Sequence, residues 1–127
     1  IYTGVEELIG QFLKEHRKRS DAKPVQVLTK FVPDYDALAS LKKHYVEKVI
    51  DRSLTRLGVE QLDMVQFSWW TYAIPRWVEV AVWLNELKQK GKINLISGTN
   101  FNTLATQAMI DAGVSISTLQ VQYSLLD

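Results

Sequence analysis

Apolar residues along the chain recur at two different spacings, and each spacing predicts its own kind of element. Apolar side chains three and four residues apart form one helical face. This spacing predicts four helices, over residues 5–19, 37–57, 75–91 and 103–112. Shorter, mostly apolar runs predict four strands, at residues 25–31, 62–70, 93–97 and 116–123. The chain therefore alternates helix and strand along its whole length.

The run from Leu62 to Trp70 lies between two long helical patterns, as a strand in the middle of a parallel sheet does. Short, right-handed crossovers leave two architectures, an open doubly wound sheet or part of a (β/α)8 barrel. A whole barrel needs about 250 residues. We expect an α/β fold of parallel (β/α) units, in which residues 1–127 form a single domain, a partial TIM barrel with about four strands and four helices. Because Ile1-Tyr2 resembles the tail of a strand and no helix follows Asp127, we expect a fragment of a longer barrel.

Composition excludes several kinds of partner. The net charge of +1 gives no general attraction to nucleic acid or to an anionic membrane surface. The chain has no cysteine, and His16 and His44 lack a second ligand at metal spacing, so we expect no metal site. No apolar run reaches the length of a membrane span and the first residues do not form a signal peptide, so a cytoplasmic location is expected.

A series of short segments along the chain resembles the aldo-keto reductase family. In chain order they are Ile1-Tyr2-Thr3-Gly4 before a helix with Glu7 and Leu8, Val27-Leu28-Thr29-Lys30, Arg56-Leu57-Gly58 leading to Leu62-Asp63, Gly98-Thr99-Asn100-Phe101, and Gln120-Val121-Gln122-Tyr123. The resemblance covers essentially the whole chain. It implies a (β/α)8 barrel, of which this chain is the part from the end of the second strand through the sixth. It also implies binding of NADPH without a G-x-G-x-x-G motif, and that motif is absent from the sequence.

The resemblance implies reduction of a small-molecule carbonyl by hydride transfer. Tyr2 matches the tyrosine that acts as general acid, and Lys30 matches the lysine that lowers the pKa of this tyrosine. The pairing is physically reasonable, because a nearby ammonium group stabilises the phenolate. The position of the family histidine is Ser68, which can donate a hydrogen bond but cannot become a cation. The family aspartate would lie before Tyr2, so we expect weak or no reduction by this chain alone.

The resemblance also assigns residues to the cofactor and to the substrate. Thr99, Asn100 and Gln122 match the polar residues that hold the nicotinamide carboxamide. Amide side chains suit this role because they offer a donor and an acceptor together. Trp69 and Trp70 end the central run and are candidates for a substrate pocket, whereas Trp77 and Trp83 lie within a predicted helix and are expected in the core or at an interface.

Three functions stay open at this point. The first is an NADPH-dependent reductase, and the second is a non-catalytic half-barrel with a binding or structural role. The third is a hydrolase or carbohydrate-binding barrel, which lacks paired acids at strand ends because Asp63 lies at a strand start. A polypeptide that ended at Asp127 would have two open sheet edges, so we expect it to form a homodimer or a higher oligomer.

Overall fold

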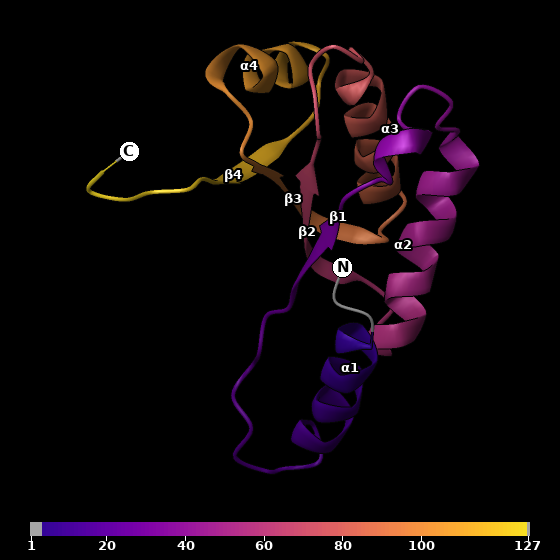
Figure 1. The fold of residues 1–127 in the computed structure, drawn as a ribbon. Coiled ribbons are helices and arrows are strands. Elements are labelled where there is room, and N and C mark those ends of the chain that lie inside the picture. The colour runs from indigo at the N-terminus through magenta and orange to yellow at the C-terminus, as the bar shows by residue number, and fades with distance from the viewer. Residues whose placement is uncertain (1–3, 127) are drawn as a thin grey trace.

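The computed structural model describes residues 4–126 and places four parallel strands in one sheet, in the order β1-β2-β3-β4 (Figure 1). The strands are β1 (Leu28–Phe31), β2 (Leu62–Ser68), β3 (Ile93–Thr99) and β4 (Ile116–Gln120). The helices are α1 (Val5–His16), α2 (Lys43–Leu57), α3 (Trp77–Gln89) and α4 (Thr103–Asp111), and η1 (Tyr35–Ala37) is a short 3-10 helix. The predicted alternation of helices with parallel strands is confirmed.

The end of α2 and the start of α4 are set by residues suited to those places. Gly58 follows α2 with a φ of 64°, a left-handed conformation that glycine adopts without steric cost. Asn102 precedes α4, and its side-chain oxygen accepts a hydrogen bond from the Ala105 N–H at 2.8 Å. These local signals fix where each helix meets the neighbouring strand.

The predicted helix over residues 37–57 is wrong in its first part. Tyr35–Ala37 forms η1, and α2 begins only at Lys43 because Lys42 has an extended backbone with φ −115° and ψ 152°. Leu38 and Leu41 are nevertheless buried. Leu38 and Leu41 are spaced as in a helix because both are buried, although they lie in the segment between η1 and α2. Apolar spacing alone does not distinguish such a segment from a helix.

Three predicted strands are shorter than expected. The strand predicted over 62–70 ends at Ser68. The segment 25–31 contributes only its last four residues to β1, since the Val27 N–H donates to Asp63 Oδ2 at 2.9 Å. Val27 directly precedes Leu28, the first residue of β1 that pairs with β2, and its N–H is bound to the Asp63 side chain. The segment 116–123 ends as a strand at Gln120.

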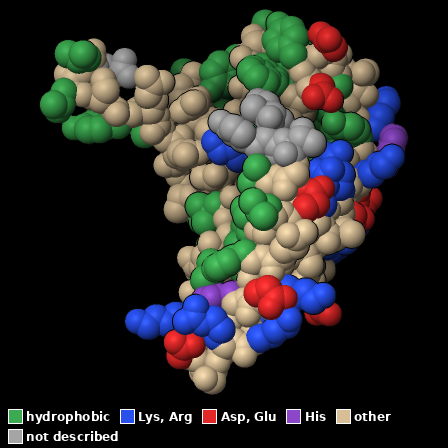
Figure 2. All heavy atoms as spheres, turned by 60° about the horizontal axis from the view of Figure 1, so that its bottom comes forward, with side chains coloured by type: hydrophobic (Ala, Val, Ile, Leu, Met, Phe, Trp, Pro, Cys, Tyr) green, Lys and Arg blue, Asp and Glu red, His purple; other side chains and the backbone are tan. Residues whose placement is uncertain are grey.

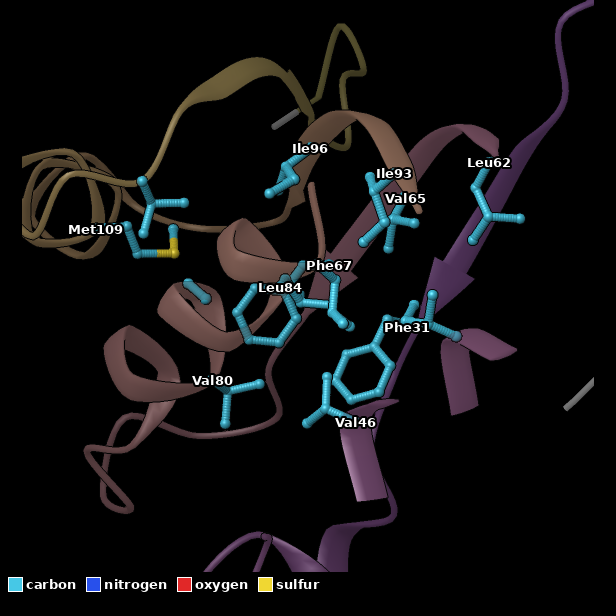
Figure 3. Packing of buried hydrophobic residues seen from close by; sticks show 14 of the residues in the cluster. Phe31, Val46, Leu62, Val65, Phe67, Val80, Leu84, Ile93, Ile96 and Met109 are labelled. Atoms are coloured by element: carbon cyan, nitrogen blue, oxygen red, sulfur yellow. The ribbon is translucent and has the colours of Figure 1, made fainter. Parts of the chain in front are cut away.

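The core lies between the sheet and helices α2, α3 and α4 (Figure 3). Phe31 and Phe67 come from adjacent strands, and their ring centroids are 6.0 Å apart. The following side chains are fully buried around them: Val46, Val65, Val80, Leu84 and Ile96. Burying one such side chain contributes about 1.5–3 kcal/mol. Because successive side chains on a strand point to opposite faces, the residues flanking Phe67 face away from this core.

Helix α1 packs against α2 but leaves most of its apolar face exposed. Of the apolar residues that share this face, Leu13 is buried, whereas Val5, Leu8 and Phe12 are exposed. Charged side chains gather at the end of the molecule formed by the last turn of α1 and the loop after it (Figure 2). This end lies opposite the carboxyl ends of the strands (Figure 1).

Candidate functional site

The carboxyl ends of three neighbouring strands place polar side chains in one row. Ser68 is the last residue of β2, Thr99 of β3 and Gln120 of β4, and the parallel register pairs Ser68 with Thr99 and Thr99 with Gln120. Residues paired in register point to the same face of a sheet. The row therefore lies on the face opposite Phe67, at the edge where parallel α/β folds bind ligands.

Lys30 lies one layer below this row. It pairs in register with Gln66, which pairs with Ser97, so the three share the face that carries Ser68 and Thr99. Lys30 is exposed, and within residues 4–126 its ammonium group forms no hydrogen bond or ion pair. Tyr2, the predicted partner of Lys30, lies outside the described residues. The predicted approach of these two side chains is therefore still a prediction.

Thr99 is buried, and its hydroxyl group has no hydrogen-bond partner within the described part of the chain. A buried hydroxyl without a partner costs about 1–3 kcal/mol, so a ligand group that bonds to it would recover this energy. Asn100 beside it is exposed and has a φ of 55°, and its N–H donates to the Gln120 carbonyl at 2.8 Å. An unpaired hydroxyl beside an exposed amide fits a carboxamide, which both donates and accepts hydrogen bonds.

Gln122, the predicted glutamine of the cofactor site, lies beyond the end of β4 and is exposed. Gln120 instead stands next to Thr99 in the row of strand ends. The sequence interpretation did not consider Gln120 as a site residue. Gln120 and Gln122 are two residues apart, so the alternation of side chains along a strand would point both to the same face of the sheet. Only the pairing with β3 shows which of them stands beside Thr99.

Ser68 is half-buried and stands between Lys30 and Thr99 in the order of the strands. Its hydroxyl group can donate one hydrogen bond to a ligand oxygen. The hydroxyl group cannot become a cation, so Ser68 can polarise a carbonyl only as a neutral hydrogen-bond donor.

The two tryptophans after β2 differ in their surroundings. Trp69 is half-buried, lies edge-on to Phe67 and donates its indole N–H to the Ile74 carbonyl at 3.0 Å. Trp70 is 53% exposed and donates to the Pro33 carbonyl at 2.7 Å, which joins the loops after β2 and β1. Trp70 is thus the more open of the two candidate pocket residues.

A hollow of about 520 Å³ lies at the opposite end of the sheet. Residues before β1 and at the start of β2 line it, among them Val27, Leu62 and Asp63. None of the candidate site residues lines it. The polar row and this hollow therefore lie at different ends of the strands. The row has the stronger claim to be the functional site because it carries the buried unpaired hydroxyl.

Comparison with known proteins identifies the family. A family model described as "Aldo/keto reductase family" matches residues 1–127. The chain belongs to the aldo/keto reductase family, and its parallel strands and helices form part of an α/β barrel of that family. The family resemblance and the fold class predicted from the sequence are confirmed.

Individual relatives cover the chain but are much longer than it. Flagellar radial spoke protein 5 of Chlamydomonas reinhardtii is 27% identical over 99% of this chain and 30% of its own length. The NADH-specific methylglyoxal reductase of Escherichia coli (strain K12) is 30% identical over 76% of this chain and 30% of its own length. A solved aldo/keto reductase from Klebsiella pneumoniae, in complex with NADP and acetate, is 28% identical with a TM-score of 0.68, over 94% of this chain and 39% of its own. The chain thus spans well under half of each relative.

No helix within residues 4–126 has the length and the hydropathy needed to cross a membrane.

Proposed function

We propose that this chain carries part of the active site of an NADPH-dependent oxidoreductase that reduces small-molecule carbonyls. The observation that carries the proposal is the row Ser68, Thr99 and Gln120 beside Lys30, at the carboxyl edge of the sheet. The solved relative in complex with NADP and the relative named as a methylglyoxal reductase support it. Because the chain spans only part of each relative, the proposal concerns the whole protein that contains it.

Cofactor binding in this proposal rests on Thr99, Asn100 and a glutamine. Bound NADPH would supply a hydride to the carbonyl carbon. The Thr99 hydroxyl and the Asn100 amide would bond to the carboxamide of the nicotinamide, and Gln120 is the better placed glutamine because it is in register with Thr99. Gln122 is the alternative that the family resemblance favoured.

Proton transfer is assigned to Tyr2 and Lys30. The Tyr2 hydroxyl would donate a proton to the carbonyl oxygen, and the Lys30 ammonium would stabilise the resulting phenolate. In its described surroundings Lys30 is free to make this contact, since no carboxylate there pairs with it. Ser68 would hold the carbonyl oxygen as a neutral donor, while Trp69 and Trp70 would bound the substrate.

Replacing Ser68 tests the proposal most directly. Ser68→His should raise kcat/KM for a simple aldehyde by about tenfold or more, since it restores a donor that can carry charge. Steady-state oxidation of NADPH and of NADH measures this, because one relative is named as NADH-specific and another binds NADP. Lys30→Met, the matched control, should abolish turnover of both the parent protein and the Ser68→His variant.

Two outcomes would contradict parts of the proposal. A folded Ser68→His variant without any gain would show that residue 68 does not contact the carbonyl. Turnover that survives Lys30→Met would remove Lys30 from the proton-transfer step.

A non-catalytic role is the second candidate function, and Ser68 is the observation that favours it. A serine hydroxyl forms a weaker hydrogen bond to a carbonyl oxygen than a charged donor does. The Chlamydomonas relative is named for a flagellar radial spoke, which is consistent with a structural or binding role in one relative. NADPH binding without oxidation by any aldehyde, in both the parent protein and Ser68→His, would favour this function.

A further inference from the structure

The loop between β2 and α3 is tied to the loops of both neighbouring strands. On one side, the Trp70 indole N–H donates to the Pro33 carbonyl in the segment after β1. On the other side, the Tyr72 hydroxyl oxygen accepts a hydrogen bond from the Asn102 N–H, after β3, at 3.1 Å. The loop that follows Ser68 therefore spans the carboxyl ends of β1, β2 and β3.

Tyr72 is held in place by its ring as well as by its hydroxyl group. The ring lies edge-on to Trp77 with centroids 5.1 Å apart and is tilted against Phe101 at 6.4 Å. Such aromatic pairs contribute about 0.5–1.5 kcal/mol beyond the area that they bury. Tyr72 is still 40% exposed, so it is not a core residue whose main effect is on global stability.

Asn102, which donates its N–H to Tyr72, belongs to the same turn as Thr99 and Asn100, the candidate cofactor-binding residues. Thr99 ends β3, Asn100 has a positive φ, Phe101 packs into the core, and Asn102 caps α4. A non-glycine residue with φ near 55° is uncommon, although asparagine adopts this conformation more readily than most residues. The Gln120 carbonyl holds this turn on one side and Tyr72 holds it on the other.

We propose that Tyr72 is a positioning residue that holds the Thr99-Asn100 turn in its ligand-binding conformation and couples it to the loop after Ser68. The inference rests on the proposed binding of NADPH at Thr99 and Asn100. Tyr72 would thus influence the affinity for the nicotinamide ring through its hydrogen bond to Asn102.

The experiment removes only the hydroxyl group. Tyr72→Phe keeps the ring contacts with Trp77 and Phe101 but takes away the acceptor for the Asn102 N–H. We expect NADPH to bind about fivefold more weakly, the effect of one ordinary hydrogen bond, with only a small fall in the melting temperature. Fluorescence titration with NADPH gives the affinity. Amide exchange should rise at residues 100–102 without NADPH and stay unchanged in α2.

Tyr35→Phe is the matched control, because Tyr35 is exposed and its phenol group forms no hydrogen bond within the described residues. It should change neither the affinity nor the exchange. If Tyr72→Phe binds NADPH as tightly as the parent protein does, the positioning role is refuted and the proposed function stands. A lower melting temperature with unchanged affinity would make Tyr72 merely structural and would also refute it. If the parent protein does not bind NADPH, the proposed function fails and this inference fails with it.

Discussion

Thr99 and Thr106 are both buried threonines, but their hydroxyl groups have different surroundings. The Thr106 hydroxyl donates to the Asn102 carbonyl at 2.9 Å, whereas the Thr99 hydroxyl has no partner among the described residues. A buried hydroxyl with a partner stabilises the fold modestly, and one without a partner destabilises it. The same substitution should therefore have opposite effects at the two positions.

Thr99→Val should raise the free energy of unfolding of the ligand-free protein by about 1 kcal/mol, because it removes a buried polar group that has no partner. It should also weaken NADPH binding if Thr99 contacts the carboxamide. Denaturant unfolding and NADPH titration measure the two effects. Thr106→Val is the control and should lower stability by about 1 kcal/mol through its lost hydrogen bond. A loss of stability in Thr99→Val would indicate that the hydroxyl group is satisfied in solution.

At the scale of whole elements, the crossing of α1 and α2 depends on one glycine. A Cβ atom at Gly10 would lie 2.2 Å from the Arg56 carbonyl oxygen, far inside van der Waals contact. The Arg56 side chain also bonds to Glu7 at 2.8 Å, and Glu6 accepts from the Thr29 hydroxyl at 2.5 Å. The missing side chain thus lets α1 approach α2 closely enough for these polar contacts with α2 and β1.

Gly10→Ala should destabilise the protein by about 1–3 kcal/mol, the usual cost of overpacking. The higher helix propensity of alanine contributes about 1 kcal/mol in the other direction, so the clash must exceed this gain. Thermal or denaturant unfolding measures the difference. Gln11→Ala, at the next and exposed position, is the control and should change stability by less than about 0.5 kcal/mol. A stabilised Gly10→Ala protein would mean that α1 does not cross α2 this closely.

Helix α2 and the end of α3 are also joined by an ion pair whose strength should depend on pH. Lys90 Nζ lies 2.9 Å from Glu47 Oε1. Hydrogen bonding to Lys90 and its charge lower the pKa of the Glu47 carboxyl below 4.5, and the same contact raises the pKa of the Lys90 ammonium above 10.5. The Glu47 contribution is present above pH 4.5 and is lost as pH falls through the lowered pKa. The Lys90 contribution is present below pH 10.5 and is lost as pH rises through the raised pKa.

Glu47→Gln should therefore lower the melting temperature at neutral pH and low salt. The difference from the parent protein should shrink in high salt, because the pair is exposed, and should disappear in acid well below pH 4.5. Thermal unfolding at several pH values and two salt concentrations measures this. Glu60→Gln is the control, since Glu60 is exposed and has no ion-pair partner within the described chain. Equal shifts in both variants would exclude a specific Glu47–Lys90 effect.

At the scale of the whole molecule, β1 and β4 are the outer strands of the described sheet, and most of β4 and half of β1 are exposed. Unpaired backbone groups on such edges favour pairing with another strand. A polypeptide of residues 1–127 expressed alone should therefore form dimers or larger oligomers.

Light scattering over a range of concentrations tests this prediction. Ser117→Lys places a charge on β4 and should shift the population toward monomer, because a lysine on an edge strand opposes strand pairing. Gln89→Lys, an equal change of charge at the exposed end of α3, should have no effect. A 127-residue polypeptide that stays monomeric at every concentration would contradict the prediction.

The order and type of the elements could be predicted from the sequence because their signals are local. Apolar spacing, Gly58 after a helix and Asn102 before one depend only on near neighbours in the chain. Lys30 and Ser68 could be placed near the carboxyl ends of strands for the same reason, whereas the structure extends β3 from the predicted residue 97 to Thr99. The roles expected for these residues came from the family resemblance and not from the spacing of apolar residues.

The sequence by itself thus determined a parallel α/β chain of this family and the strand ends that carry its polar residues. Only the tertiary structure showed that Gln120 stands beside Thr99, because this placement depends on hydrogen bonds between β3 and β4. It also decided that the Thr99 hydroxyl lacks a partner and that Tyr72 reaches Asn102. These facts depend on contacts between residues 20 to 30 positions apart, and local spacing carries no information on which distant side chains meet.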